Sequence, residues 1–185
     1  MTGTASLGAE AREVLGAGAG RRTAVEPLVH NPKNGVTAGV WRVRAGDRSA
    51  VPKLLTRRKT AEGRWAASDD PRHRDHRRRE AHVDESGSGK AWQPYGIRAP
   101  RPPACVERPD GDVALWLEDV PGEPATSCTV ERHVRQARRL GAAQGAFGPT
   151  DRPWPARRFL RQYVVSTRAG TPRRRGMATA TAPGP

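Results

Sequence analysis

The pattern of hydrophobic and polar residues in the first two thirds of the chain predicts two β-hairpins. One joins strands at 40–44 and 49–55 through the turn Ala45-Gly-Asp-Arg48. The other joins strands at 104–107 and 113–118 through a turn rich in Pro, Asp and Gly. The strands of a hairpin pair in the antiparallel sense, so we expect an antiparallel sheet.

Helical signals are found in later segments of the chain. Asp70-Pro71 can open a helix, because proline is tolerated at the first helical position, and we expect that helix at about 73–85. Apolar residues recur at helical spacing over 130–147, and a further helix is expected around 155–165. The ends of the chain differ. Residues 1–22 predict a frayed helix or a flexible N-terminus, and 166–185 predict a disordered tail.

The net charge of +14 raises the question of nucleic-acid binding, because clustered basic residues neutralise phosphates and release counterions. However, only four of the 33 basic residues are lysines, and Ala, Gly and Pro are abundant, which together indicate the coding bias of a GC-rich genome. We therefore expect no specific nucleic-acid partner. A small basic nucleic-acid-binding protein is kept as an alternative.

The remaining composition points to a cytoplasmic protein with no membrane partner. No run approaches the roughly 20 apolar residues that span a bilayer, and the N-terminus lacks a secretory pattern. Cys105 and Cys128 form no metal-type cluster. His73, His76 and His82 lie among arginines, which makes a poor metal site, so no metal ligands are predicted.

A glycine-containing segment lies between two predicted strands. Gly35 and Gly39 flank Thr37, and a hairpin turn of this kind can bring backbone N–H groups close to phosphate oxygens, because no side chains obstruct them. The segment is not a Walker loop, since no Gly-Lys-Ser/Thr opens a helix after it. An ordinary hairpin turn is the alternative interpretation.

Lys53 and Glu80 are candidate partners in a phosphate site. Lys53 lies in an otherwise apolar run, and a lysine in an arginine-rich chain indicates a need for a compact ammonium. Glu80, on the following predicted helix, has the position of the glutamate that pairs with such a lysine in kinases. The alternatives are a lysine that faces solvent at a strand edge and a glutamate that lies on the surface beside arginines.

The strand at 113–118 ends in an acidic turn. Glu118, Asp119 and Val120 occupy the place where backbone groups would read an adenine base. A core strand followed by an ordinary turn explains the same pattern. His73-Arg74-Asp75 has the letters of a kinase catalytic triplet, but it precedes this strand rather than following it, so no catalytic residue is assigned there.

At these residues the sequence resembles the aminoglycoside phosphotransferase family over about 25–163. The resemblance implies an α+β, protein-kinase-like N-terminal lobe, with an antiparallel sheet plus one helix, at 23–120. The first helices of an incomplete C-terminal lobe would follow at 121–165. The motifs that carry it are Val36-Thr-Ala-Gly-Val-Trp, Arg78-Arg-Glu-Ala, Leu115-Trp-Leu-Glu-Asp-Val and Ala137-Arg-Arg-Leu-Gly-Ala-Ala-Gln-Gly.

The resemblance also implies a function. ATP with Mg would be the phosphoryl donor and a small hydroxylated molecule the acceptor. Lys53 would hold the α/β-phosphates, Glu80 would orient Lys53, and 118–120 would line the adenine hinge.

Three departures from the family pattern bear on that function. Pro52 precedes the lysine, the helix before Glu80 is unusually basic, and no His-x-Asp triplet with its metal-binding Asn follows Val120. We therefore expect a truncated and catalytically incomplete small-molecule kinase. The alternative within this class is a non-catalytic, pseudokinase-like nucleotide-binding module. The apolar stripe over 130–147 is expected to lack cover and to promote self-association.

Overall fold

The computed structural model describes residues 3–16, 23–32, 34–59, 66–123, 125–146, 152, 153 and 155. In this part of the chain a five-stranded antiparallel sheet has the order β1-β2-β3-β5-β4. The strands are β1 (Thr23–Pro27), β2 (Thr37–Ala45), β3 (Arg48–Leu55), β4 (Ala104–Glu107) and β5 (Val113–Glu118). The helices are α1 (Gly3–Leu15), α2 (Arg79–Glu85), α3 (Ser88–Ala91) and α4 (Val130–Ala146). The α+β class and the antiparallel sheet are thus confirmed.

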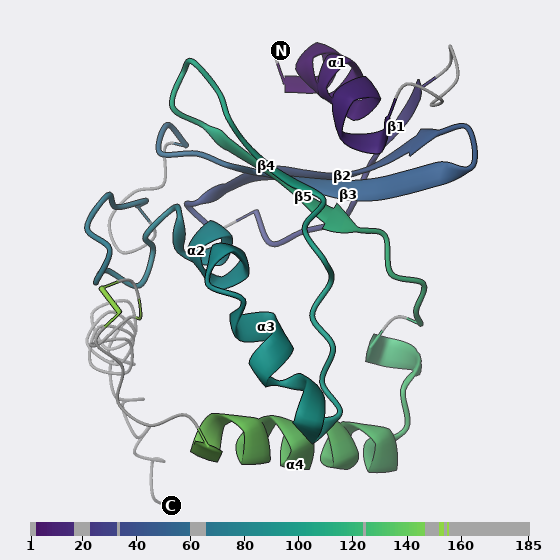
Figure 1. The fold of residues 1–185 in the computed structure, drawn as a ribbon, viewed down its shortest axis with the longest axis vertical. Coiled ribbons are helices and arrows are strands. Elements are labelled where there is room, and N and C mark those ends of the chain that lie inside the picture. Colours follow the sequence, from purple (N-terminus) through teal and green to yellow (C-terminus); the bar gives the residue numbers. More distant parts are fainter. Residues whose placement is uncertain are drawn as a thin grey trace, which may run out of the picture.

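The elements form layers on the two sides of the sheet. Helix α1 lies on one face, α2 lies under the other, and α3 leads from α2 to α4 at the far end of the molecule (Figure 1). No helix of the described residues is long and apolar enough to cross a membrane.

Both predicted hairpins are present. β2 and β3 are joined by a turn at Gly46 and Asp47, where Gly46 has φ +63°, and β4 and β5 are joined by a turn in which Gly111 has φ +82°. Both values lie in the left-handed region, which glycine enters without the steric penalty of a Cβ atom. Local turn chemistry therefore determines where each hairpin reverses.

β3 is a central strand, although it contains a proline. It pairs with β2 on one side and with β5 on the other, and the side chain of Pro52 is fully buried. In the ladder between β2 and β3, the pair Val40↔Lys53 is followed by the pair Val43↔Ala50. Pro52, which has no N–H to donate, lies between these two pairs. The ladder toward β5 continues through Pro52↔Trp116.

Of the two alternatives predicted for 1–22, a helix is observed over Gly3–Leu15, which forms α1. Leu7, Ala11 and Leu15 are buried and recur every four residues, so they share one face of the helix. This face packs in one core cluster with Val43 and Trp116 of the sheet. The Ala- and Gly-rich segment 3–15 is therefore an amphipathic helix.

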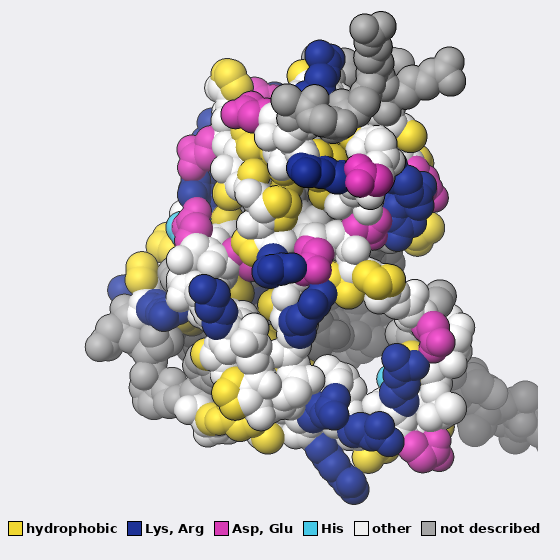
Figure 2. Space-filling view, turned by 45° about the vertical axis from the view of Figure 1, so that its right-hand side comes forward, with side chains coloured by type: hydrophobic (Ala, Val, Ile, Leu, Met, Phe, Trp, Pro, Cys, Tyr) yellow, Lys and Arg dark blue, Asp and Glu magenta, His cyan; other side chains and the backbone are white. Residues whose placement is uncertain are grey.

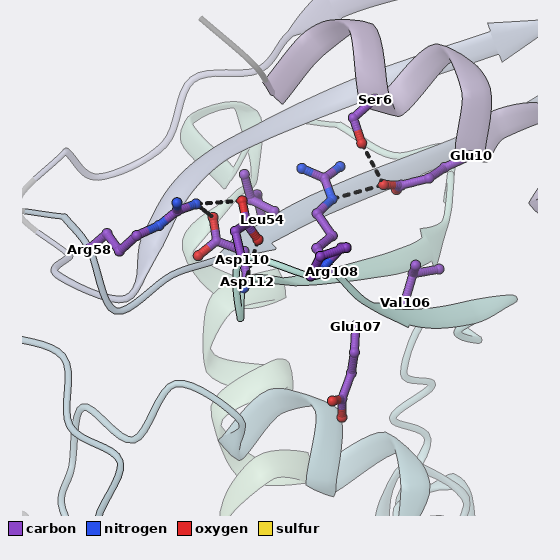
Figure 3. A pocket seen from close by; sticks show the side chains of 10 residues that line it. Ser6, Glu10, Leu54, Arg58, Val106, Glu107, Arg108, Asp110 and Asp112 are labelled. Atoms are coloured by element: carbon purple, nitrogen blue, oxygen red, sulfur yellow. Dashed lines mark hydrogen bonds and ion pairs between the residues drawn. The ribbon is translucent and has the colours of Figure 1, made fainter.

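Glu10 fastens α1 to the sheet. Its carboxylate accepts hydrogen bonds from Arg108 Nε at 2.8 Å, Trp116 Nε1 at 3.1 Å and Ser6 Oγ at 2.8 Å. The Arg108 and Glu10 side chains are only 9% and 13% exposed, so this ion pair is largely removed from solvent. The residues lie beside a cavity of about 430 Å³ between α1, Leu54 and the β4–β5 turn (Figure 3).

The helix predicted at about 73–85 begins later, at Arg79, and ends at Glu85 as expected. The guanidinium of Arg79 donates hydrogen bonds to the backbone carbonyls of Pro71, His73 and Arg74. These carbonyl groups thus accept from a side chain before α2 begins, and the His73 carbonyl also accepts from the His76 N–H at 3.0 Å. Gly87, with φ +66°, terminates the helix, and the short helix α3 follows it.

The predicted helix over 130–147 is confirmed for α4, which lies against the 3₁₀ turn Gln93–Tyr95. Val130, Val134 and Leu140 of its apolar stripe are 72%, 43% and 38% exposed. Phe147, the helix expected around 155–165 and the tail at 166–185 lie outside the described residues, apart from isolated positions.

The packing of α1 generates a stability prediction. Leu7→Ala should lower the free energy of unfolding by about 2–5 kcal/mol, because it leaves a cavity between α1 and the sheet. Denaturant unfolding monitored by tryptophan fluorescence measures this change. Arg12→Ala, at an exposed position of the same helix, is the control and should change the value by less than about 0.5 kcal/mol. Wild-type stability of Leu7→Ala would show that α1 does not cover the sheet.

The exposed stripe on α4 generates a prediction about association. Val134→Glu should shift the sedimentation of concentrated protein toward the monomer, because a charge opposes apolar contact between copies. Ala142→Glu, which adds the same charge at an exposed position outside the stripe, should leave the distribution as in wild type. Monodisperse wild-type monomer at every concentration would contradict association through this stripe.

Candidate functional site

Lys53 and Glu80 meet on the face of the sheet that α2 covers. Lys53 Nζ lies 2.6 Å from Glu80 Oε1 and 2.7 Å from Oε2. The two side chains are 19% and 47% exposed. The predicted pairing is confirmed, and Lys53 is not a lysine that faces solvent at a strand edge, because β3 is central. The more exposed Glu80 leaves one side of the pair open to solvent.

The backbone explains why these two residues meet. Successive β3 residues point to opposite faces, so Lys53 shares its face with Leu55, which is fully buried with Val113 and Leu115 in a second core cluster. On α2, Ala81 is fully buried, and Glu80 precedes it. A partly exposed ion pair contributes only ~0.2–1 kcal/mol to stability. The pair therefore orients the ammonium more than it stabilises the fold.

An apolar surface adjoins the ammonium. Val40 is opposite Lys53 in the β2–β3 ladder, and Val51 is opposite Leu117 in the β3–β5 ladder, so these three residues share the face of Lys53. All three are half-buried. The surface thus combines apolar side chains with the Lys53 ammonium, and Arg42, two residues after Val40 on the same face, is paired with Asp119 at 2.9 Å.

A hollow of about 210 Å³ lies on the same face beside α2. It is lined by Glu80, Val83, Asp84, Pro100, Leu115 and Leu117. Burial raises the pKa of Asp84, and the nearby carboxylates of Glu80 and Glu85 raise it further. The α2 side of the hollow is therefore acidic, whereas its β5 side is apolar.

The structure places Gly39 in β2 rather than in the turn before it. Gly39 pairs with Leu54, and a bulge separates it from Thr37. A Cβ atom at Gly39 would overlap the indole ring of Trp41, so the packing of Trp41 requires glycine here. Thr37 is buried, and its hydroxyl has no hydrogen-bond partner among the described residues. Of the three predicted turn residues, only Gly35 lies in the connection that precedes β2.

Lys59 fastens this connection, and sequence reasoning missed it. Its Nζ donates hydrogen bonds to the backbone carbonyls of Asn34 and Thr37, at 3.0 Å each. The Val36 N–H is bonded to Asn34 Oδ1 at 2.9 Å, and the Val36 carbonyl accepts from the Thr56 N–H at 2.8 Å. The rarity of lysine, which singled out Lys53, applies equally to Lys59.

The carboxylates after β5 are bound to arginines and a backbone amide. Glu118 accepts from the Arg101 N–H at 3.2 Å and pairs with Arg98 at 2.9 Å. The Arg101 N–H, together with the charges of Arg98 and Arg101, holds the pKa of Glu118 below its ordinary value. Asp119 accepts from Arg42 Nε at 2.9 Å, and Val120 is exposed. Both carboxylates are thus occupied, and so is the Glu118 N–H, which donates to the Arg101 carbonyl at 2.8 Å.

A pair of histidines lies in and just before α2. The rings of His76 and His82 stack with centroids 5.5 Å apart, and His76 Nδ1 lies 3.3 Å from the Ser68 carbonyl oxygen. Burial lowers the pKa of His76, the Ser68 carbonyl opposes that shift, and the positive charges of His82 and Arg79 add to it. No group of three or more His, Cys, Asp or Glu in the described part of the chain could hold a metal ion.

Comparisons with protein-family models, with curated proteins and with solved structures found no match to this chain. The site is therefore interpreted from its own geometry.

The buried His76 generates a pH prediction. The pKa of His76 in the folded chain lies below the ordinary value of 6.5. At pH values between the folded-state pKa and 6.5, the unfolded chain therefore binds more protons than the folded chain. The stabilising contribution of neutral His76 is complete above about pH 6.5 and decreases as the pH falls through this window. Melting temperatures between about pH 7.5 and 5 should show this loss for wild type.

Two variants identify the group that titrates. His76→Gln should flatten the pH dependence, because glutamine takes up no proton in this range. His133→Gln, on the exposed face of α4, should retain the wild-type slope. An identical slope in His76→Gln and wild type would assign the loss to another group.

Proposed function

We propose that this chain binds ATP or a similar nucleoside triphosphate through a protein-kinase-like N-terminal lobe, of the kind found in aminoglycoside phosphotransferases. The observation that carries the proposal is the Lys53–Glu80 ion pair, formed between the central strand β3 and the next helix along the chain. The pair presents an oriented ammonium beside an apolar surface. A nucleotide requires both features, one for its phosphates and one for its base.

The phosphates are assigned to Lys53. A lysine ammonium is a compact point charge with three donors, and Glu80 holds it in place without enclosing it. In protein kinases a lysine on the third strand contacts the phosphates and pairs with a helix glutamate. The connection that contains Gly35 precedes β2, which is the neighbour of β3.

The base is assigned to the surface formed by Val40, Val51 and Leu117. These residues belong to three adjacent strands and share the face of Lys53. Leu117 is followed within β5 by Glu118 and then by Asp119, so the backbone of 118–120 lies at the margin of this surface. The Glu118 N–H already donates to the Arg101 carbonyl at 2.8 Å, so the edge of an adenine would be read by the backbone groups of Asp119 and Val120.

The described residues contain no group of three or more His, Cys, Asp or Glu that could hold a metal ion, so no magnesium ligand is assigned among them. The sequence after Val120 also contains no His-x-Asp triplet. The family resemblance would make the bound nucleotide a phosphoryl donor to a small hydroxylated acceptor in the manner of a small-molecule kinase. For the residues described we propose nucleotide binding alone, which is also what a pseudokinase-like module would do.

Binding to nucleic acid is the weaker alternative. On the face drawn in Figure 2, Asp and Glu side chains lie beside Lys and Arg side chains mainly in the upper part, and fewer acidic side chains accompany the basic ones in the lower part. Arg42, Arg44, Arg58 and Arg77 are each engaged by carboxylates. A protein that binds a nucleic-acid groove needs basic side chains that are clustered and directed at the phosphates. The pairing of these four arginines with carboxylates favours a structural role for them.

Calorimetric titration with ATP tests the proposal. Wild type should bind, and Lys53→Ala should lose at least about tenfold in affinity, because hydrogen bonds to charged groups contribute ~1.5–3 kcal/mol each. Lys90→Ala, which removes an exposed lysine on α3, is the charge-matched control and should bind as wild type does. Equal affinity of wild type and Lys53→Ala, with both proteins folded, would refute the assignment of Lys53.

A further inference from the structure

The connection before β2 is held by Lys59, which is a different lysine from the proposed phosphate ligand Lys53. Lys59 Nζ binds the carbonyl oxygens of Asn34 and Thr37 at 3.0 Å each, so it closes both ends of the segment 34–37. Each peptide group is planar and trans, with its N–H directed opposite to its C=O. The N–H groups of Gly35 and Ala38 therefore point away from the Lys59 ammonium.

The segment that carries Lys59 is itself anchored to the sheet. Thr56 Oγ1 donates to Asp112 Oδ1 at 2.7 Å in a buried hydrogen bond, and it accepts from the Arg58 N–H at 3.0 Å. The Arg58 guanidinium also binds Asp112 and Asp110 at 2.7 Å each. Hydrogen bonds and ion pairs thus connect the β4–β5 turn to residues 56–59, and these residues to the segment 34–37. Figure 3 shows the contacts of Arg58 with Asp110 and Asp112.

We infer that Lys59 is a positioning residue for the phosphate end of the proposed nucleotide site. This inference rests on the proposed function. By binding two carbonyl groups, Lys59 keeps their partial negative charges directed to one side of the segment and fixes the backbone conformation on which N–H contacts to an anion depend. Lys59 thereby increases affinity for phosphates without contacting the base.

A purely structural role for Lys59 leads to a different expectation. If Lys59 only stabilised the end of β3, its loss would weaken binding of nucleotide and nucleoside equally, or would affect neither. A role in positioning the phosphate segment affects ATP and leaves adenosine unchanged. The comparison of these two ligands therefore separates the roles.

The test uses the full chain with Lys59→Met, Lys59→Arg and Lys90→Met, the last as a control for loss of an exposed lysine. ATP affinity is measured by calorimetry and adenosine affinity by competition against ATP. Lys59→Met should weaken ATP about tenfold and leave adenosine unchanged, since two charge-assisted hydrogen bonds are lost. Lys59→Arg, which keeps donors and charge, should recover most of the affinity, and Lys90→Met should behave as wild type.

Hydrogen exchange without ligand gives an independent readout. The amides of Val36 and Thr56, which are bonded within this network, should exchange faster in Lys59→Met than in wild type. If Lys59→Met does not fold, Lys59→Gln, which keeps one donor group, replaces it with a smaller expected loss. Unchanged ATP affinity, or equal losses for ATP and adenosine, would overturn the inference.

The outcome also distinguishes this inference from the proposed function. If wild type binds ATP and Lys59→Met binds it equally well, the inference fails and the proposed function stands. If wild type binds no ATP, the proposed function fails and the nucleotide role of Lys59 fails with it. Faster exchange in Lys59→Met would then support only an anchor for the segment 34–37.

Discussion

The structure depends on the burial of β3 from both sides of the sheet. Its even-numbered residues Ala50, Pro52 and Leu54 are buried, with Ala50 and Leu54 in the core cluster beneath α1. The odd-numbered Lys53 and Leu55 face α2. A strand in this position needs a layer on each face, and α1 supplies one of them. With one face closed by α1, the other can carry a charged group next to apolar residues without loss of the core.

The candidate site contains two local departures from ordinary strand chemistry. A lysine occupies a central strand beside a proline that cannot donate to the ladder, and both would weaken an ordinary β-strand. The ion pair with Glu80 contributes too little to stability to explain the lysine, since partly exposed pairs contribute ~0.2–1 kcal/mol. Departures of this kind without a gain in stability are typical of functional positions. They support the assignment of Lys53 to a ligand rather than to the fold.

Features governed by local chemistry could be predicted from the sequence, whereas those that need distant partners could not. The hairpins follow from Gly46 and Gly111, and the Lys53–Glu80 pair follows from the order of strand and helix. A helix within 1–22 was one of two predictions, but its burial could not be predicted, because it depends on Val43 and Trp116, far along the chain. The late start of α2 reflects the side chain of Arg79. Lys59 was missed because its partners are backbone carbonyls, which the sequence does not identify, although lysine is as rare at this position as at Lys53.

We propose that the nucleotide binds on the α2 face of the sheet and not on the α1 face. The most direct measurement is the change in NMR chemical shifts of the full chain on titration with ATP. The account predicts shifts at Val40, Val51 and Leu117, with little change at Val43, Ala50 and Trp116 beneath α1. Shifts confined to the α1 face, or no shifts at saturating ATP, would contradict it.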